Sequence, residues 1–314
     1  MTDTPPFVRP DVAGFLAFLN SQPGPALNEL PLDEARMAYT VMGSVAEADP
    51  RPLAVIRDLS CPGPGGDIPL RLYDARENRE AGPVVMFYHG GGFMIGDLDS
   101  HHALCTEIAA ELDLPVVAVH YRRAPEAPFP AAPDDCEAAS RWVAGNPAEL
   151  GRTATGLVPM GDSAGGNLTI VTAQAFKAAP AAVPVVLQVP IYPATDESQD
   201  GSMAQFAEGH LLTREVMNWF MGSYAPQAGD PRAYPIHSDP EGSPPTILVV
   251  AGLDPLRDQG RRYAARLALA GVDVNFMEMR GSIHGFCNIR KAVPSAQTDT
   301  LAILAAVRLK LSQL

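Results

Sequence analysis

The chain has 314 residues, of which 46% are hydrophobic and 19% are charged, and its formal net charge is −13. A chain of this length and composition can bury a sizeable core, as one large domain or two ordinary ones. The negative charge argues against nucleic acid or an anionic membrane as a partner, because both need a basic protein face.

The four cysteines are scattered, and no two of them form a C-x-x-C motif; they are Cys61, Cys105, Cys136 and Cys287. This pattern predicts free, buried thiols and neither a zinc ribbon nor a redox pair. The first six residues show no basic or apolar region typical of a signal peptide, and no apolar run is long enough to span a bilayer. We therefore expect a cytoplasmic protein with no stable membrane association.

The N-terminal segment precedes any strand pattern. Residues 12–19 and 32–45 have amphipathic spacing and predict two short helices. We assign residues 1–48 to the first part of a cap. Residues 56–59 and 68–73 then predict a strand pair, because residues 62–67 of the link between them are all glycine, proline or aspartate, which favour turns.

Continuous apolar runs follow, of the kind that predicts strands buried on both faces of a parallel sheet. They cover residues 84–88, 116–119, 156–160, 185–189 and 246–250, and the alternating segment 272–277 predicts one more strand. Helical stretches lie between the strands, at about 101–112, 134–146, 164–179, 256–270 and 296–312. This alternation predicts an α/β fold with a mostly parallel sheet flanked by helices.

Residues 200–225 break the alternation, because they are rich in methionine and aromatic residues and lack a strand pattern. We assign them to the second part of the cap, and residues 49–199 and 226–314 to the main α/β domain. Ligands of open α/β sheets bind at the carboxyl edge of the strands, where insertions shape the pocket. Ordinary helix packing is the alternative for this segment.

Ser163 lies in a G-x-S-x-G motif between a predicted strand and a predicted helix, with Gly161 and Gly165 on either side. A serine on such a turn has a strained backbone and needs small neighbours, and the helix N-terminus behind it favours a nearby oxyanion. The alternative is a glycine-rich turn with an incidental serine. The rest of the chain favours the nucleophile.

His89-Gly90-Gly91-Gly92 follows the strand at 84–88 and leaves backbone N–H groups uncovered, as an oxyanion hole requires. A phosphate-binding loop is the competing interpretation, but neither G-x-G-x-x-G nor a following Lys-Ser/Thr pair is present. We interpret His89 as structural, because it precedes the nucleophile in the chain.

His284 is the best candidate for a general base, because it lies in a loop after the last predicted strand with glycines on both sides. Asp254 follows the strand at 246–250 and gives the chain order Ser…Asp…His. Its alternative role is to cap the following helix. His101 and His102, near the start of another helix, are expected to be surface or cap side chains.

These motifs together resemble the bacterial hormone-sensitive-lipase family (family IV) of carboxylesterases, within the α/β-hydrolases. The matching stretches are residues 89–92, 161–166, 254–258 and 284–286, and the resemblance runs from about 83 to 286. Residues 121–126 and 129–131 also match a structural stretch of the family. Arg123 is a departure there, since the family usually has leucine.

The resemblance implies an eight-stranded sheet, a helical cap, no cofactor or metal, and hydrolysis of short- to medium-chain acyl esters. It implies that Ser163 is the nucleophile, His284 the base and Asp254 the acid that orients it. The backbone N–H groups of Gly91, Gly92 and Ala164 would bind the oxyanion. It also implies a homodimer that pairs through the last edge strand, at residues 272–277.

Candidates for substrate contacts are less specific, because each side chain could equally belong to the core. They are Phe93, Asp162, Tyr192, Phe206, Leu211 and Trp219. Asp162 has the alternative of bonding backbone or a neighbouring loop.

Three other functions are alternatives to a carboxylesterase. The plant gibberellin receptors resemble the same family without its catalytic histidine, and His284 argues against such a binding role. The triad alone does not separate an esterase from an amidase, peptidase or acyltransferase. An interfacial lipase is disfavoured by the missing secretion signal.

Overall fold

The computed structural model describes residues 6–199 and 201–314, so the first five residues of the predicted cap segment 1–48 lie outside the described part. A single eight-stranded sheet organises this part of the chain, in the order β1-β2-β4-β3-β5-β6-β7-β8. The strands β3 to β8 run parallel, and β2 runs antiparallel to both of its neighbours. The predicted α/β fold with a mostly parallel sheet is confirmed.

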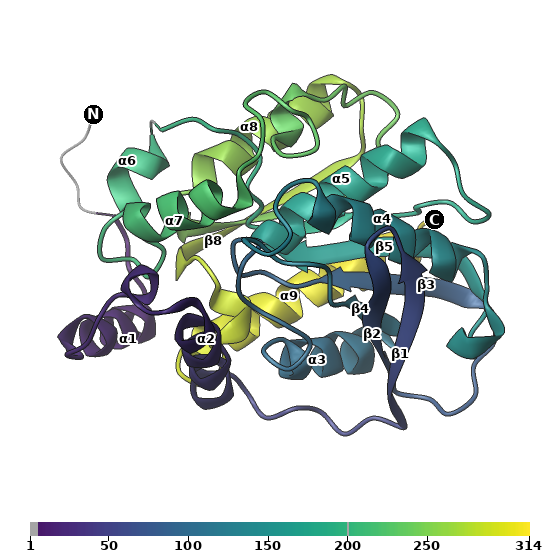
Figure 1. Cartoon of the computed structure of the whole chain (residues 1–314), viewed down its shortest axis with the longest axis horizontal. Coiled ribbons are helices and arrows are strands. Elements are labelled where there is room, and N and C mark those ends of the chain that lie inside the picture. The colour runs from purple at the N-terminus through teal and green to yellow at the C-terminus, as the bar shows by residue number, and fades with distance from the viewer. Residues whose placement is uncertain (1–5, 200) are drawn as a thin grey trace.

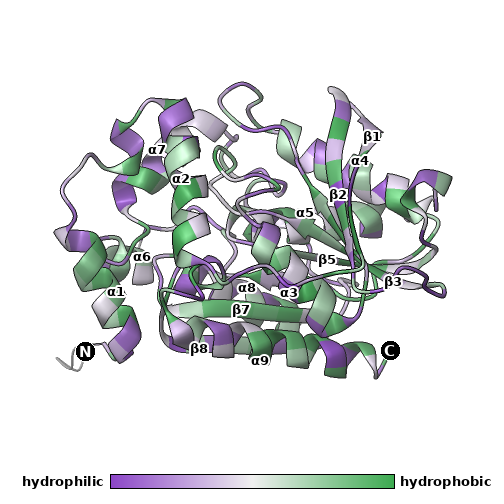
Figure 2. Cartoon of the chain, turned by 90° about the horizontal axis from the view of Figure 1, so that it is seen from below, coloured by the Kyte–Doolittle hydropathy of each residue, from purple (hydrophilic) through white to green (hydrophobic). Residues whose placement is uncertain are grey.

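The strands are β1 (Val55–Gly63), β2 (Gly66–Asp74), β3 (Gly82–Tyr88), β4 (Val116–Val119), β5 (Ala154–Asp162), β6 (Val189–Ile191), β7 (Thr246–Leu253) and β8 (Val274–Ile283). Central strands such as β7 are buried along their whole length, as their continuous apolar runs predict. Figure 2 shows β7 mostly green across the middle of the molecule.

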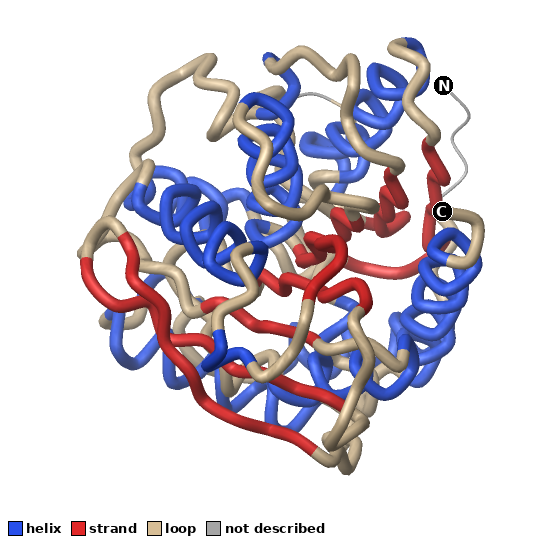
Figure 3. The backbone as a smooth tube through the Cα atoms, turned by 90° about the vertical axis from the view of Figure 1, so that its right-hand side faces the viewer, coloured by secondary structure: helices blue, strands red, loops and turns tan. Residues whose placement is uncertain are grey.

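Helices cover both faces of the sheet (Figures 1 and 3). On one face lie α4 (Ala131–Ala144), α5 (Ala164–Ala178) and α8 (Arg257–Leu269), and on the other lie α3 (His102–Leu112) and α9 (Pro294–Leu311). Short 3-10 turns complete the layers: Leu27–Glu29, Ala148–Leu150, Pro235–His237 and Phe286–Asn288. Each parallel strand therefore ends between helices, with its carboxyl end open to the same edge.

Four further helices lie together on one side of the molecule, seen at the left of Figures 1 and 2. They are α1 (Pro10–Ser21), α2 (Leu32–Ala46), α6 (Ser202–Phe206) and α7 (Arg214–Tyr224). Contacts join the two segments: Asn20 donates to the Gly209 carbonyl at 3.4 Å, and Leu27 packs against the cluster that holds Phe220. The predicted helical character of residues 201–225 is confirmed, and residue 200 lies outside the described part.

Most strands extend beyond their predicted bounds, and two predictions differ more than the others. The run at 185–189 predicts a strand, but the regular ladder of β6 covers only Val189–Ile191, because Val185 and Gln188 make isolated bridges to different neighbours. The last strand begins at Val274 and extends to Ile283, beyond the predicted 272–277. Val272 belongs to the turn after α8, where its N–H donates to the Leu267 carbonyl at 3.0 Å.

All four cysteines are buried and unpaired, which confirms the predicted free thiols. Within residues 6–199 and 201–314, no helix combines the length and apolar character needed to cross a bilayer.

Candidate active site

Ser163 stands between β5 and α5 with φ 57° and ψ −116°, a conformation that non-glycine residues rarely adopt. Its backbone N–H donates to the Ile191 carbonyl of the adjacent strand at 2.9 Å, and its own carbonyl accepts from Asn167 at 3.1 Å. The strained turn is therefore held between sheet and helix, and the side chain projects at the carboxyl end of β5.

The glycines on either side of Ser163 are required because the backbone of Tyr88 passes close to both of them. A Cβ added to Gly161 would lie 2.4 Å from the Tyr88 carbonyl oxygen, and one added to Gly165 would lie 1.8 Å from the same atom. Real Cβ atoms do not come so near, so the motif needs glycine at both positions. This packing brings the end of β3, and the loop after it, against the serine turn.

His284 and Asp254 complete a hydrogen-bonded chain with Ser163. His284 Nε2 lies 2.8 Å from Ser163 Oγ, and His284 Nδ1 lies 2.7 Å from Asp254 Oδ2. Asp254 is fully buried and His284 is 7% exposed. In this geometry the serine hydroxyl can donate to Nε2 while Nδ1–H donates to the carboxylate.

Asp254 makes one contact that bears on each of the two roles predicted for it. One carboxylate oxygen meets His284, and the other accepts the Leu256 N–H at 2.8 Å, just before α8 begins at Arg257. The bond to Leu256 fixes the rotamer that faces His284. The helix-start and triad interpretations are therefore compatible.

The loop 89–96 lies beside the serine turn because Tyr88 of β3 pairs with Gly161 of β5. Gly91 and Gly92 have φ angles of 113° and 59°, which favour glycine. A Cβ on Gly92 would lie 2.1 Å from the Phe220 ring of α7, so the loop is also packed under that helix. Ala164 opens α5, where the first N–H groups have no partner within the helix.

Asp162 fastens this loop to the serine turn. Its Oδ1 accepts the Gly90 N–H at 2.8 Å and lies 3.2 Å from His101 Nε2, and its Oδ2 accepts from Asn288 at 3.1 Å. Burial works to raise the pKa of Asp162, but His101 and the Gly90 N–H outweigh it and hold that pKa below its ordinary value. These contacts agree with the neighbouring-loop interpretation of Asp162.

The expectation that His101 is a surface residue is wrong, because the side chain is 1% exposed. It is buried since it supplies the partner that the Asp162 carboxylate needs inside the protein. His102 is half-buried and lies 3.2 Å from the Tyr73 hydroxyl. Neither His101 nor Asn288 stood out in the sequence as a partner of Asp162, because their pairing depends on three loops meeting at one sheet edge.

His89 is held within its loop, as expected for a structural residue. The ring stacks on Tyr121 with centroids 4.2 Å apart, and Nδ1 lies 2.8 Å from the Gly90 carbonyl oxygen. Burial first, with His101 nearby, lowers the pKa of His89 well below its ordinary value. A neutral ring locked in this way supports the loop.

The candidate substrate contacts divide by burial. Phe93, Tyr192 and Phe206 are at most 3% exposed, while Leu211 and Trp219 are partly exposed. Tyr192 is nearest to the triad, with its ring centroid 4.8 Å from that of His284. Phe93 stacks on Tyr224 of α7 at 3.9 Å, and Trp219 stacks on Phe220 at 5.2 Å. The ring contact with His284 therefore places Tyr192 beside the triad, while a substrate contact by any of the five stays a prediction.

A serine at a strained strand-to-helix turn, followed in the chain by a buried aspartate and a histidine that joins them, defines the serine-hydrolase type of α/β protein. Comparison with known proteins agrees. The family model described as the alpha/beta hydrolase fold matches residues 85–288, and the chain belongs to this family. The predicted resemblance to bacterial hormone-sensitive-lipase-type carboxylesterases is confirmed.

Relatives of the chain include proteins named as ester hydrolases. The carboxylic ester hydrolase LipN of Mycobacterium tuberculosis is 39% identical over 87% of this chain and 75% of its own. The ethyl acetate hydrolase of Pseudomonas putida is 34% identical over 96% of this chain and 98% of its own. Among solved structures, an ester hydrolase from the Lake Arreo metagenome superposes with a TM-score of 0.90 at 35% identity, covering 98% of this chain and 100% of that one.

Proposed function

We propose that this carboxylic ester hydrolase acts on short- to medium-chain acyl esters, with Ser163 as nucleophile, His284 as general base and Asp254 as the acid that orients it. The observation that carries the proposal is the unbroken hydrogen-bonded chain from Ser163 Oγ through His284 to Asp254, with links of 2.8 and 2.7 Å. Nucleophile and base are within the reach that proton transfer requires.

The reaction runs in two halves. His284 Nε2 takes the proton of Ser163 as Oγ attacks the ester carbonyl, and Asp254 stabilises the imidazolium that forms. The tetrahedral intermediate collapses, and the alcohol leaves with the proton from His284. Water, activated by the same nitrogen, then attacks the acyl-enzyme and releases the carboxylic acid and Ser163.

The oxyanion of each tetrahedral intermediate would be bound by the backbone N–H groups of Gly91, Gly92 and Ala164. Support comes from the two glycines with positive φ beside the serine turn and from the start of α5 at Ala164. Donors fixed in advance near the developing charge are worth about a hundredfold to a thousandfold in rate each. Asp162 would act indirectly here, by anchoring Gly90.

Residues 1–48 and 200–225 would form a cap over the site, with Phe93, Tyr192, Phe206, Leu211 and Trp219 lining its apolar interior. Support comes from α7, whose Phe220 lies over Gly92 of the loop. An apolar lining favours acyl or alcohol groups that are apolar. The name of the ethyl acetate hydrolase relative supports a short acyl group.

A series of p-nitrophenyl esters, from acetate to palmitate, tests this function with the wild type and Ser163→Ala. We expect hydrolysis of the short and medium chains, lowered by several orders of magnitude in the variant. The chain-length optimum would give the size of the acyl pocket. Activity that survives in Ser163→Ala would refute the assigned nucleophile, and an inactive wild type would favour a binding role.

A further inference from the structure

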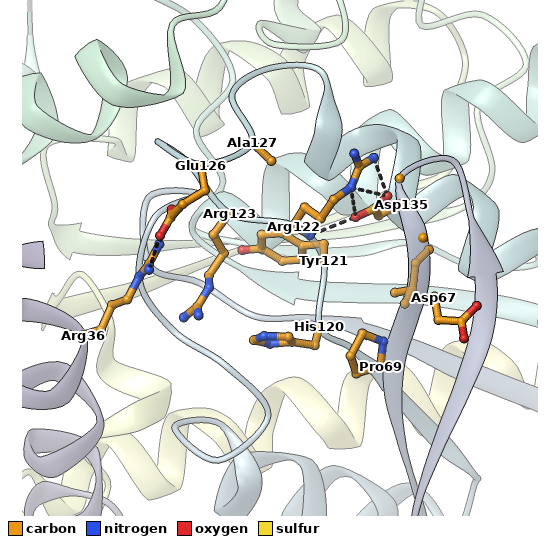
Figure 4. Close-up of a pocket in the computed structure, with 13 residues that line it drawn as sticks. Arg36, Asp67, Pro69, His120, Tyr121, Arg122, Arg123, Glu126, Ala127 and Asp135 are labelled. Atoms are coloured by element: carbon orange, nitrogen blue, oxygen red, sulfur yellow. Dashed lines mark hydrogen bonds and ion pairs between the residues drawn. The ribbon is translucent and has the colours of Figure 1, made fainter. Parts of the chain in front are cut away.

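A hollow with a volume of about 420 Å³ lies away from the triad (Figure 4). Its walls come from the turn between β1 and β2, from the segment after β4, and from α2, which contributes Arg36. None of Ser163, Asp254 or His284 lines it. The volume is in the range of sites that hold small molecules.

Two of the three arginines in this pocket are already neutralised. Arg122 makes a two-pronged contact with Asp135, with distances of 2.8 and 2.9 Å. Arg36 binds both carboxylate oxygens of Glu126, at 2.7 and 2.8 Å. Their guanidinium groups therefore have anionic partners within the protein.

Arg123 differs from both. Its Nη1 donates to the Gly96 carbonyl at 2.6 Å, and no carboxylate of the described residues forms an ion pair with it. Burial first, and then the charge of Arg36, lower the pKa of Arg123, and together they outweigh the opposite effect of the nearby Asp97 and Glu126 carboxylates. In Figure 4 its guanidinium lies between Arg36 and His120.

His120 adds a second unused polar group. Its Nδ1 is buried without a hydrogen-bond partner among the described residues, so Nε2 is the ring nitrogen left to meet a ligand in the pocket. A neutral imidazole carries one N–H that can donate to a ligand. The pocket therefore offers a guanidinium and an imidazole on neighbouring residues, with Ile68 and Ala127 as apolar surface beside them.

We propose that this pocket binds a small organic carboxylate, held by Arg123 and His120 with its short alkyl group against Ile68 and Ala127. The guanidinium fork matches a carboxylate, and a bound carboxylate would give Arg123 the direct ion pair that it does not form within the described part of the protein. The apolar wall favours an alkyl carboxylate over inorganic phosphate. The site does not depend on ester hydrolysis, because it shares no residue with the triad.

Calorimetric titration of butyrate into Ser163→Ala protein tests the proposal without turnover. We expect saturable binding that is about tenfold or more weaker in Arg123→Leu/Ser163→Ala, since a charged hydrogen bond is lost. Butyramide has the same shape without the charge, and inorganic phosphate has the charge without the alkyl group. Both are expected to bind more weakly than butyrate.

Asp67→Asn supplies a variant that leaves Arg123 in place. Asp67 is exposed at the rim, so removing its charge is expected to tighten butyrate binding by about twofold to fivefold without disturbing the fold. The proposal is overturned if butyrate fails to bind, or if it binds equally well after Arg123→Leu. Binding of butyramide or phosphate as tight as that of butyrate would overturn the carboxylate assignment.

Discussion

Asp162 is a buried carboxylate that acts on the proposed reaction indirectly, by holding the loop 89–96 in place. It holds Gly90 through Oδ1 and meets Asn288 through Oδ2. In Asp162→Asn the charge is lost and the Gly90 loop loosens, so we expect kcat to fall by roughly tenfold to a hundredfold with little change in KM. Steady-state kinetics on a p-nitrophenyl ester measure this. A change confined to KM would show that Asp162 acts on substrate binding instead.

The same residue predicts how stability depends on pH. The folded-state pKa of Asp162 lies below its ordinary value of 3.8, so its stabilisation is complete above that value and is lost as pH falls through the folded pKa. The free energy of unfolding of the wild type should therefore approach that of Asp162→Asn below about pH 4. Urea unfolding of both proteins between about pH 7 and pH 3 tests this. A constant difference over the range would contradict it.

The serine turn sets a requirement on a whole strand–turn–helix unit. In Gly165→Ala the new Cβ would meet the Tyr88 carbonyl, so β3 and α5 must separate, and we expect a loss of about 3 kcal/mol and of activity. Gly222→Ala in α7 is the matched control, because nothing lies within 4 Å of its added Cβ. It should stabilise the protein by about 0.5–1 kcal/mol. Thermal unfolding of both variants measures these changes in stability. A Gly165→Ala protein as stable as the wild type would contradict the close packing of β3 against α5.

At the scale of elements, the sequence predicts what depends on local pattern. Buried parallel strands such as residues 116–119 are continuous apolar runs, so their positions can be predicted. The bounds of β6 could not, because residues 185–188 are as apolar as a strand but bridge to two different neighbours. The length of β8 depends on its pairing with β7 up to Leu253, which no local pattern reports.

Of the two edge strands of the sheet, β1 and β8, the predicted dimer uses β8. β8 is the last strand in the order, and Arg9 covers only its far end through a bond to the Gly281 carbonyl. The predicted homodimer would pair this edge, where Phe276 is 39% exposed. Light scattering after size exclusion should give twice the mass of one chain for the wild type. For Phe276→Glu it should give the mass of a single chain. A monomeric wild type would contradict the dimer.

Across the molecule, the proposed catalytic residues are easier to predict from the sequence than the residues that hold them in place. Ser163, Asp254 and His284 follow a chain order and a glycine context that single them out, and the structure joins them by hydrogen bonds. His101 and Asn288 have no such context. Their contact with Asp162 exists only after the ends of several strands meet, so tertiary structure was needed to find it.

The central claim is that Ser163 is a nucleophile activated by His284, and covalent labelling tests it most directly. A p-nitrophenyl alkylphosphonate is incubated with the wild type and His284→Ala, and the adduct is followed by intact mass and located by peptide mapping. The account predicts one adduct per chain, on Ser163, formed about a hundredfold or more slowly in the variant. An adduct on another residue, or equal rates in both proteins, would contradict it.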